Sequence, residues 1–187
     1  SGSSDAQDPA LHAGHHALEG EARLDEGALN TWFRAHVADP AEPLVLSQFN
    51  RGASNPTYLI TAGTQRWVLR KKPPGTLLPS AHQVDREYRV MSALGGIGFP
   101  VPRMRALCED ASVIGTAFYV MDFLEGRIFR NVRLPGMQPA ERAAIYDDLN
   151  ATLARLHQVD YAAIGLADYG RPGNYFQRQI DRWIKQY

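Results

Sequence analysis

Apolar residues recur along this chain in two periods, and the changes between them divide it into helical and β-rich parts. Leu29, Trp32, Phe33 and Val37 recur at helical spacing, which predicts a first helix. Asp25 stands where an N-cap would lie, and its carboxylate suits that position. Residues 1–22 lack any period and are rich in Ser, Gly, Ala, Asp and His, so we expect a mobile tail there, with residues 1–4 as an expression scar.

From residue 44 the pattern becomes that of strands. Three β-rich segments, interrupted by Gly52 and by Ala62-Gly63-Thr64, predict an antiparallel meander. Two further β-rich segments follow later in the chain and predict a sheet of five strands. The five segments are residues 44–46, 57–60, 66–70, 106–108 and 117–123.

Helical spacing returns three times after the meander. One helix is predicted from Ser80 to the Gly95-Gly96 pair, which suits a helix end. Pro139 suits the first position of a long second helix, and a last helix begins near Phe176. The apolar stripes of the last two helices have too few partners within these 187 residues, so we expect the chain to be the N-terminal part of a longer one.

The order of elements predicts an α+β fold, with a five-stranded antiparallel small lobe followed by the start of a helical second lobe. We place the small lobe and the linker that leaves it at residues 23–125. Residues 126–187 are then the beginning of the helical lobe. Such a division into two lobes favours a ligand held between them.

Composition and charge narrow the class of protein. The 187 residues are 44% hydrophobic and 21% charged, and the 20 basic side chains balance the 20 acidic ones, which argues against a nucleic-acid partner. Cys108 is the single cysteine, so no internal disulfide forms and a reducing compartment is favoured. The sequence has neither an apolar run of 18 residues nor a secretory h-region, so we expect a cytoplasmic protein without a membrane partner.

The turn between the first two strands is the first candidate for ligand binding. Backbone N–H groups of a turn that contains Gly52 can point at phosphate oxygens, and Ser54 and Asn55 add side-chain donors. One glycine does not make a phosphate-binding fingerprint, so an ordinary hairpin turn is the alternative.

A cation and a carboxylate provide the second candidate. If Val68 faces the interior of the lobe, Arg70 shares its face and can bind phosphates, whereas Lys71 points to solvent. Glu87 lies on the apolar stripe of the helix, where an unpaired charge is costly, so we expect it to pair with Arg70. The alternatives are strand-end surface charges and a glutamate at the edge of the stripe.

The third candidate is the strand end Met121-Asp122-Phe123-Leu124, which runs toward Gly126. A chain that crosses between two lobes can present backbone N–H and C=O groups to the edge of an adenine base. A buried strand and turn is the alternative. The order of turn, cation, carboxylate and linker is nevertheless that of a protein kinase, which predicts ATP binding.

Several segments together resemble the aminoglycoside phosphotransferase-type family of kinase-like proteins, and most closely its branch linked to acyl-CoA dehydrogenases. The resemblance covers roughly residues 44–187. It rests on Gly52-Ala53-Ser54-Asn55-Pro56-Thr57-Tyr58, Val68-Leu69-Arg70-Lys71-Lys72-Pro73-Pro74-Gly75, Leu78-Pro79-Ser80-Ala81-His82, Pro100-Val101-Pro102, Cys108-Glu109-Asp110, Ile114-Gly115-Thr116 and Gly165-Leu166-Ala167-Asp168-Tyr169-Gly170.

The resemblance implies a bilobal protein-kinase-like fold, ATP with Mg²⁺, and transfer of phosphate to the hydroxyl of a small molecule, such as a hydroxyacyl-CoA. It also implies an acyl-CoA dehydrogenase domain or protein as partner. The chain departs from the family pattern at Arg70, where kinases usually have lysine. The family's catalytic and metal-binding motifs have no counterpart in these residues and are expected beyond Tyr187, so no catalytic or metal residue is assigned. The alternative functions are a non-catalytic nucleotide- or CoA-binding module of pseudokinase type and a purely structural domain.

Overall fold

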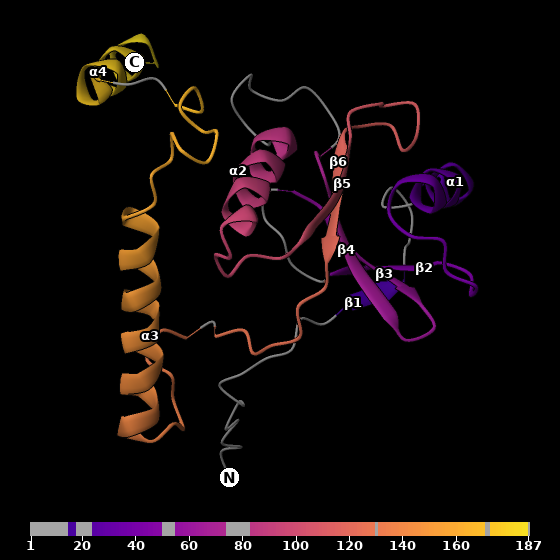
Figure 1. The fold of residues 1–187 in the computed structure, drawn as a ribbon, viewed down its shortest axis with the longest axis horizontal. Helices are drawn as coiled ribbons and strands as arrows, with labels where there is room; N and C mark the ends of the chain where they lie inside the picture. Colours follow the sequence, from indigo (N-terminus) through magenta and orange to yellow (C-terminus); the bar gives the residue numbers. More distant parts are fainter. Residues whose placement is uncertain are drawn as a thin grey trace.

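A computed structural model of the protein describes residues 15–17, 24–49, 55–73, 83–129, 131–170 and 173–186. The described residues form one antiparallel sheet and four helices (Figure 1). The elements are β1 (His15–Ala17), α1 (Glu26–His36), β2 (Val45–Phe49), β3 (Thr57–Ala62), β4 (Gln65–Lys71), α2 (Val84–Gly96), β5 (Met104–Cys108), β6 (Phe118–Asp122), α3 (Pro139–His157) and α4 (Tyr175–Gln186).

The sheet has the strand order β1-β2-β3-β4-β6-β5, with every neighbouring pair antiparallel. The five predicted strands are present, and β4 lies beside β6 although α2 and β5 separate them in the sequence. β1 was not predicted: it lies in the segment expected to be a tail, and its three residues pair with β2. A strand this short has no readable period, so only its partner reveals it.

Local signals explain where the helices begin and end. The Asp25 carboxylate accepts a hydrogen bond from the Ala28 N–H at 2.9 Å, which confirms the predicted N-cap of α1. Pro139 is the first residue of α3, as its missing N–H allows. α2 begins at Val84, after an N-cap at Gln83, and ends at the Gly95-Gly96 pair, whereas the predicted start at Ser80 lies outside the described residues.

The main hydrophobic core lies between α1 and one face of the sheet. Leu29 and Phe33 of α1 are fully buried against this face, and the Phe33 ring meets Trp67 edge-on with centroids 5.0 Å apart. α2 lies on the opposite side of the sheet (Figure 1), where it approaches β5 and β6. The two helices therefore cover different faces of the sheet.

The predicted position of Lys71 is wrong. Trp67 and Leu69 belong to the core under α1, and Lys71 follows them on the same face with only 8% of its surface exposed. Its ammonium lies 6.0 Å from the centroid of the Tyr58 ring, and burial lowers its pKa. The prediction failed because three successive residues of β4, Trp67 to Leu69, are all buried, so both faces of this strand are apolar.

The last two helices have the exposed apolar faces that were expected. In Figure 1, α3 lies beyond α2 as seen from the sheet, and no residue of α3 is buried. Five large hydrophobic side chains of α4 are also exposed, among them Phe176 at 81%. The exposed members of the two predicted stripes are Leu149, Leu153, Leu156, Phe176, Ile180, Trp183 and Ile184.

Candidate functional site

Arg70 of β4 and Glu87 of α2 meet on the face of the sheet that α2 approaches. Arg70 Nε donates to Glu87 Oε2 at 2.8 Å, and Arg70 Nη2 donates to Oε1 at 3.4 Å. The predicted ion pair is therefore confirmed. Its side chains are 28% and 33% exposed, so water and a ligand can reach them. A guanidinium held by a carboxylate keeps its remaining N–H groups in a fixed direction, which suits phosphate oxygens.

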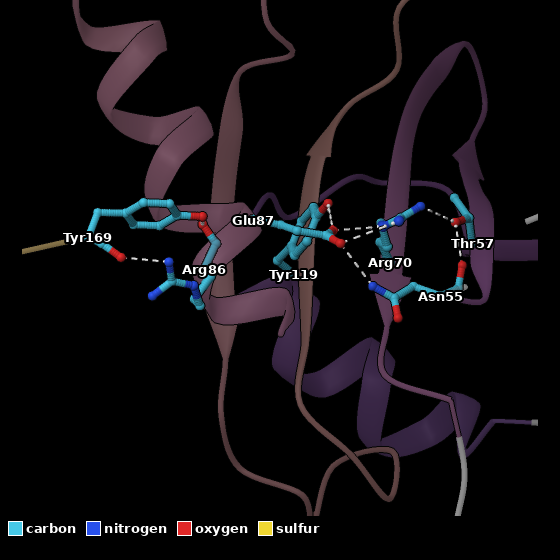
Figure 2. A network of polar contacts seen from close by, with 7 residues as sticks. All are labelled: Asn55, Thr57, Arg70, Arg86, Glu87, Tyr119 and Tyr169. Atoms are coloured by element: carbon cyan, nitrogen blue, oxygen red, sulfur yellow. Dashed lines mark hydrogen bonds and ion pairs between the residues drawn. The ribbon is translucent and has the colours of Figure 1, made fainter. Parts of the chain in front are cut away.

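Two nearly buried side chains hold the same carboxylate in place (Figure 2). Tyr119 Oη donates to Glu87 Oε2 at 2.9 Å, and Asn55 Nδ2 donates to Oε1 at 3.0 Å. Both residues are 1% exposed. Glu87 is thus bound from β4, from β6 and from the segment just before β3, so three parts of the chain set its position.

The electrostatics keep Tyr119 in its donor form. Burial and, second, the adjacent Glu87 carboxylate raise the pKa of the Tyr119 phenol above its ordinary value. The hydroxyl is therefore protonated at neutral pH and available to the carboxylate. No role was predicted for Tyr119, although its two-residue spacing from Met121 places both side chains on the face of the sheet that Arg70 also shares.

The turn that was predicted to bind phosphate is described only at its end. Gly52 and Ser54 lie outside the described residues, and their predicted contacts with a nucleotide stay predictions. Asn55 is described, and its side-chain amide donates a hydrogen bond to the Glu87 carboxylate. Arg70 Nη1 donates to Thr57 Oγ1 at 3.4 Å, and that hydroxyl donates to the Asn55 carbonyl at 3.0 Å. Arg70 is therefore tied to the point where the chain leaves the turn.

A cleft of about 640 Å³ lies beside the strand end that was predicted to hold a base. Leu59 and Val68 line it from the sheet, together with the four predicted residues Met121, Asp122, Phe123 and Leu124. Its volume is within the range of small-molecule sites, and apolar walls of this kind suit a flat aromatic ring. This places the predicted residues in one cavity, while their contact with a nucleotide stays a prediction.

Hydrogen bonds within the sheet determine which backbone groups of residues 121–124 are available to bind a ligand. The Asp122 N–H donates to the Arg103 carbonyl at 2.9 Å, and the Asp122 carboxylate pairs with Arg105. Phe123 and Leu124 follow the last paired residue of β6. If a base binds here, its edge would therefore meet the backbone of Phe123 and Leu124 rather than the N–H of Asp122.

A second cavity of about 400 Å³ lies at the ion pair and shares two lining residues with this cleft. Arg70, Glu87 and Tyr119 line it, and Pro102 and Met121 line both cavities. The cationic end of the site is therefore next to its apolar end. An apolar cleft beside a fixed cation suits a ligand that has both an apolar part and an anionic part.

Within the part of the chain that the structure describes, no group of three or more His, Cys, Asp or Glu side chains could hold a metal ion. None of the described helices combines the length and the apolar character that a membrane span requires.

A sheet that fixes a strand cation against a helix carboxylate, beside a cleft at the strand leading out of the lobe, is the arrangement of a kinase-like small lobe. The chain belongs to the phosphotransferase enzyme family, whose family model matches residues 45–187. This agrees with the expected α+β kinase-like fold and with the resemblance noted in the sequence.

Comparisons with individual proteins support the same assignment. A crystal structure from Ralstonia eutropha JMP134, provisionally named an aminoglycoside phosphotransferase, has 55% identity and a TM-score of 0.75 over 88% of this chain and 47% of that one. Rat acyl-CoA dehydrogenase family member 11 is 49% identical over 89% of this chain and 21% of its own length. Mouse acyl-CoA dehydrogenase family member 10 is 50% identical over 78% of this chain and 14% of its own length. The chain thus spans about a fifth or less of these two relatives.

Proposed function

We propose that this chain is the nucleotide-binding part of an ATP-dependent phosphotransferase that acts on the hydroxyl of a small molecule. The family supports a kinase-like phosphotransferase. The single observation that supports ATP as donor is the fixed Arg70–Glu87 pair next to an apolar cleft. Phosphoryl transfer depends mainly on positioning and charge, and a strand cation held by a helix carboxylate supplies both at the phosphates.

The residues present fit ATP and leave magnesium unassigned. The cleft walled by Leu59, Val68 and Met121 suits the base, and Arg70 in the adjacent cavity suits a phosphate group. Mg²⁺, which the family generally uses, would neutralise phosphate charge when bound. The described residues offer it no group of side-chain ligands, so we assign it none.

We propose a hydroxyacyl-CoA, such as a 4-hydroxyacyl-CoA, as the acceptor, and an acyl-CoA dehydrogenase domain or protein in the cytoplasm as the partner. The support is that similar curated proteins are named acyl-CoA dehydrogenase family members. Phosphorylation would turn the hydroxyl into a leaving group. An aminoglycoside is the less favoured acceptor, because only the name of the structural neighbour suggests it.

Calorimetric titration with ATP tests the donor. We expect saturable binding that Arg70→Ala weakens by about 5- to 150-fold, the equivalent of the 1–3 kcal/mol of a charge-assisted contact. Arg34→Ala is the matched control, because Arg34 is similarly exposed but pairs with Asp39 beside the α1 helix. Equal affinities for Arg70→Ala and the unmodified chain would refute the assignment of Arg70.

Release of ADP tests the acceptor, measured on a protein that also contains the catalytic residues expected beyond Tyr187. A 4-hydroxyacyl-CoA should increase ADP release from ATP, whereas the same acyl-CoA without its hydroxyl should not. An aminoglycoside that increases ADP release instead would overturn the proposed acceptor. Nucleotide binding without ADP release for any of these compounds would favour the non-catalytic nucleotide- or CoA-binding module.

A further inference from the structure

The helix that contains Glu87 is held on its other side by two arginines. Arg86 Nη2 donates to the Tyr169 carbonyl at 2.6 Å, and the Arg86 guanidinium carbon lies 3.9 Å from the centroid of the Tyr169 ring. Tyr169 Oη in turn donates to the Arg86 carbonyl at 3.4 Å. Figure 2 shows Arg86 and Tyr169 beside the network of Glu87. Arg86 and Tyr169 are 83 positions apart in the sequence.

Arg89, one turn further along α2, contacts the same loop. Arg89 Nη2 donates to the Gly165 carbonyl at 2.8 Å, and the guanidinium pairs with the Asp168 carboxylate. This ion pair is exposed, so its contribution by itself is small. Together with Arg86, however, it gives α2 two points of attachment that lie about one turn apart.

Polar contacts such as these help to fix the rotation of α2, together with the contact of the Tyr88 ring with the Tyr119 ring, whose centroids are 6.1 Å apart. The buried residues of the helix are Val84 and Leu94, at its two ends, and Arg86 to Val90 between them lack a buried side chain. Glu87 is adjacent to Arg86, so their side chains project about 100° apart around the axis. A rotation that moved Glu87 away from Arg70 would therefore also move Arg86 away from Tyr169.

The loop that receives the two arginines is held by its own local contacts. The Asp160 carboxylate accepts hydrogen bonds from the Ala162 and Ala163 N–H groups at 3.0 and 3.1 Å. Leu166 is buried, its N–H donates to the Tyr161 carbonyl at 2.8 Å, and its carbonyl accepts from the Tyr169 N–H at 3.0 Å. Residues 159–170 follow directly on the end of α3, so a shift of α3 would reach α2 through this loop.

We propose that Arg86 and Arg89, with Gly165, Asp168 and Tyr169, form a clamp that orients α2 so that Glu87 faces Arg70. The five residues act as positioning residues: they touch neither the cleft nor the cavity of the ion pair. The role of the clamp in nucleotide affinity rests on the proposed function above, whereas its effect on the orientation of α2 does not. The position of the second lobe would thereby set the affinity of the first lobe for nucleotide.

The test combines ATP affinity with hydrogen exchange of the α2 amides. Arg86→Ala should weaken ATP binding by about fivefold or more, the lower range of measured couplings between sites, and should speed exchange at residues 87–91. Tyr169→Phe keeps the ring and the carbonyl that Arg86 contacts, so it should retain the affinity and the exchange rates of the unmodified chain. If Arg86→Ala does not unfold cooperatively, Tyr169→Ala is used in its place, because this change removes the ring that Arg86 contacts and leaves the sequence of α2 unchanged.

A double-mutant cycle separates positioning from loss of stability. If the clamp acts through Glu87, Arg86→Ala should weaken ATP binding in the unmodified chain and have no further effect in Glu87→Ala. The same loss of affinity in both backgrounds, or none in either, would overturn the proposal while leaving the nucleotide site intact. If the unmodified chain does not bind ATP, the proposed function fails, and hydrogen exchange alone decides: faster exchange in Arg86→Ala but not in Tyr169→Phe supports the clamp, and unchanged exchange overturns it.

Discussion

Replacing Glu87 by alanine should lower the free energy of unfolding by about 3 kcal/mol, because one carboxylate accepts from three side chains. The largest share comes from the Tyr119 hydroxyl, which is buried and loses its acceptor, at about 1–3 kcal/mol. The Asn55 amide loses one bond, at about 1 kcal/mol. Arg70 is partly exposed and water can solvate it, so its share is below about 1 kcal/mol.

Urea denaturation followed by circular dichroism and by the fluorescence of the buried Trp67 measures this loss by linear extrapolation. Glu87→Gln should lose less, about 1–2 kcal/mol, because its amide oxygen still accepts from Tyr119.

Glu141→Ala is the matched control for the Glu87 variants. It removes a carboxylate that pairs with Arg127 at 3.2 Å in an exposed ion pair, so it should lose less than about 1 kcal/mol. If Glu87→Ala and Glu141→Ala lost the same free energy, Glu87 would not be the shared acceptor of a buried network, and the reasoning would be refuted.

Three further predictions concern other parts of the lobe. Because folding raises the pKa of Tyr119, its phenol loses the proton at a lower pH in the unfolded state, so its contribution to stability should be full below about pH 10 and fall at higher pH. In Tyr119→Phe the urea midpoint should therefore decline less steeply at alkaline pH. An unchanged decline would argue against a buried phenol. Lys71→Met should raise the free energy of unfolding by up to about 1 kcal/mol, since burial already disfavours the charge of Lys71. If urea denaturation showed instead that the variant is less stable than the unmodified chain by more than about 1 kcal/mol, Lys71 would have a charged partner. Asp25→Ala should lower the thermal midpoint through a loss of about 1 kcal/mol, while Asp25→Asn, which can still cap α1, should match the parent chain.

Sequence reasoning succeeded where a local physical rule had one solution. Asp25 had to cap α1 because few residues satisfy free N–H groups at a helix start, and Pro139 suits only the beginning of α3. The Arg70–Glu87 pair also followed from a rule, since a carboxylate on an apolar stripe needs a cation and the nearest β-strand offered one. These rules involve few neighbours, so the sequence alone could determine them.

The tertiary structure decided everything that depended on which elements meet. Strand β4 is apolar on both faces, so the two-residue period could not tell which face α1 would cover, and Lys71 was misplaced for that reason. Tyr119 contacts Glu87 across 32 residues of sequence, and Tyr169 contacts Arg86 across 83 residues. No period along the chain encodes such distant neighbours, because they become neighbours only when the sheet, α2 and the loop after α3 pack together.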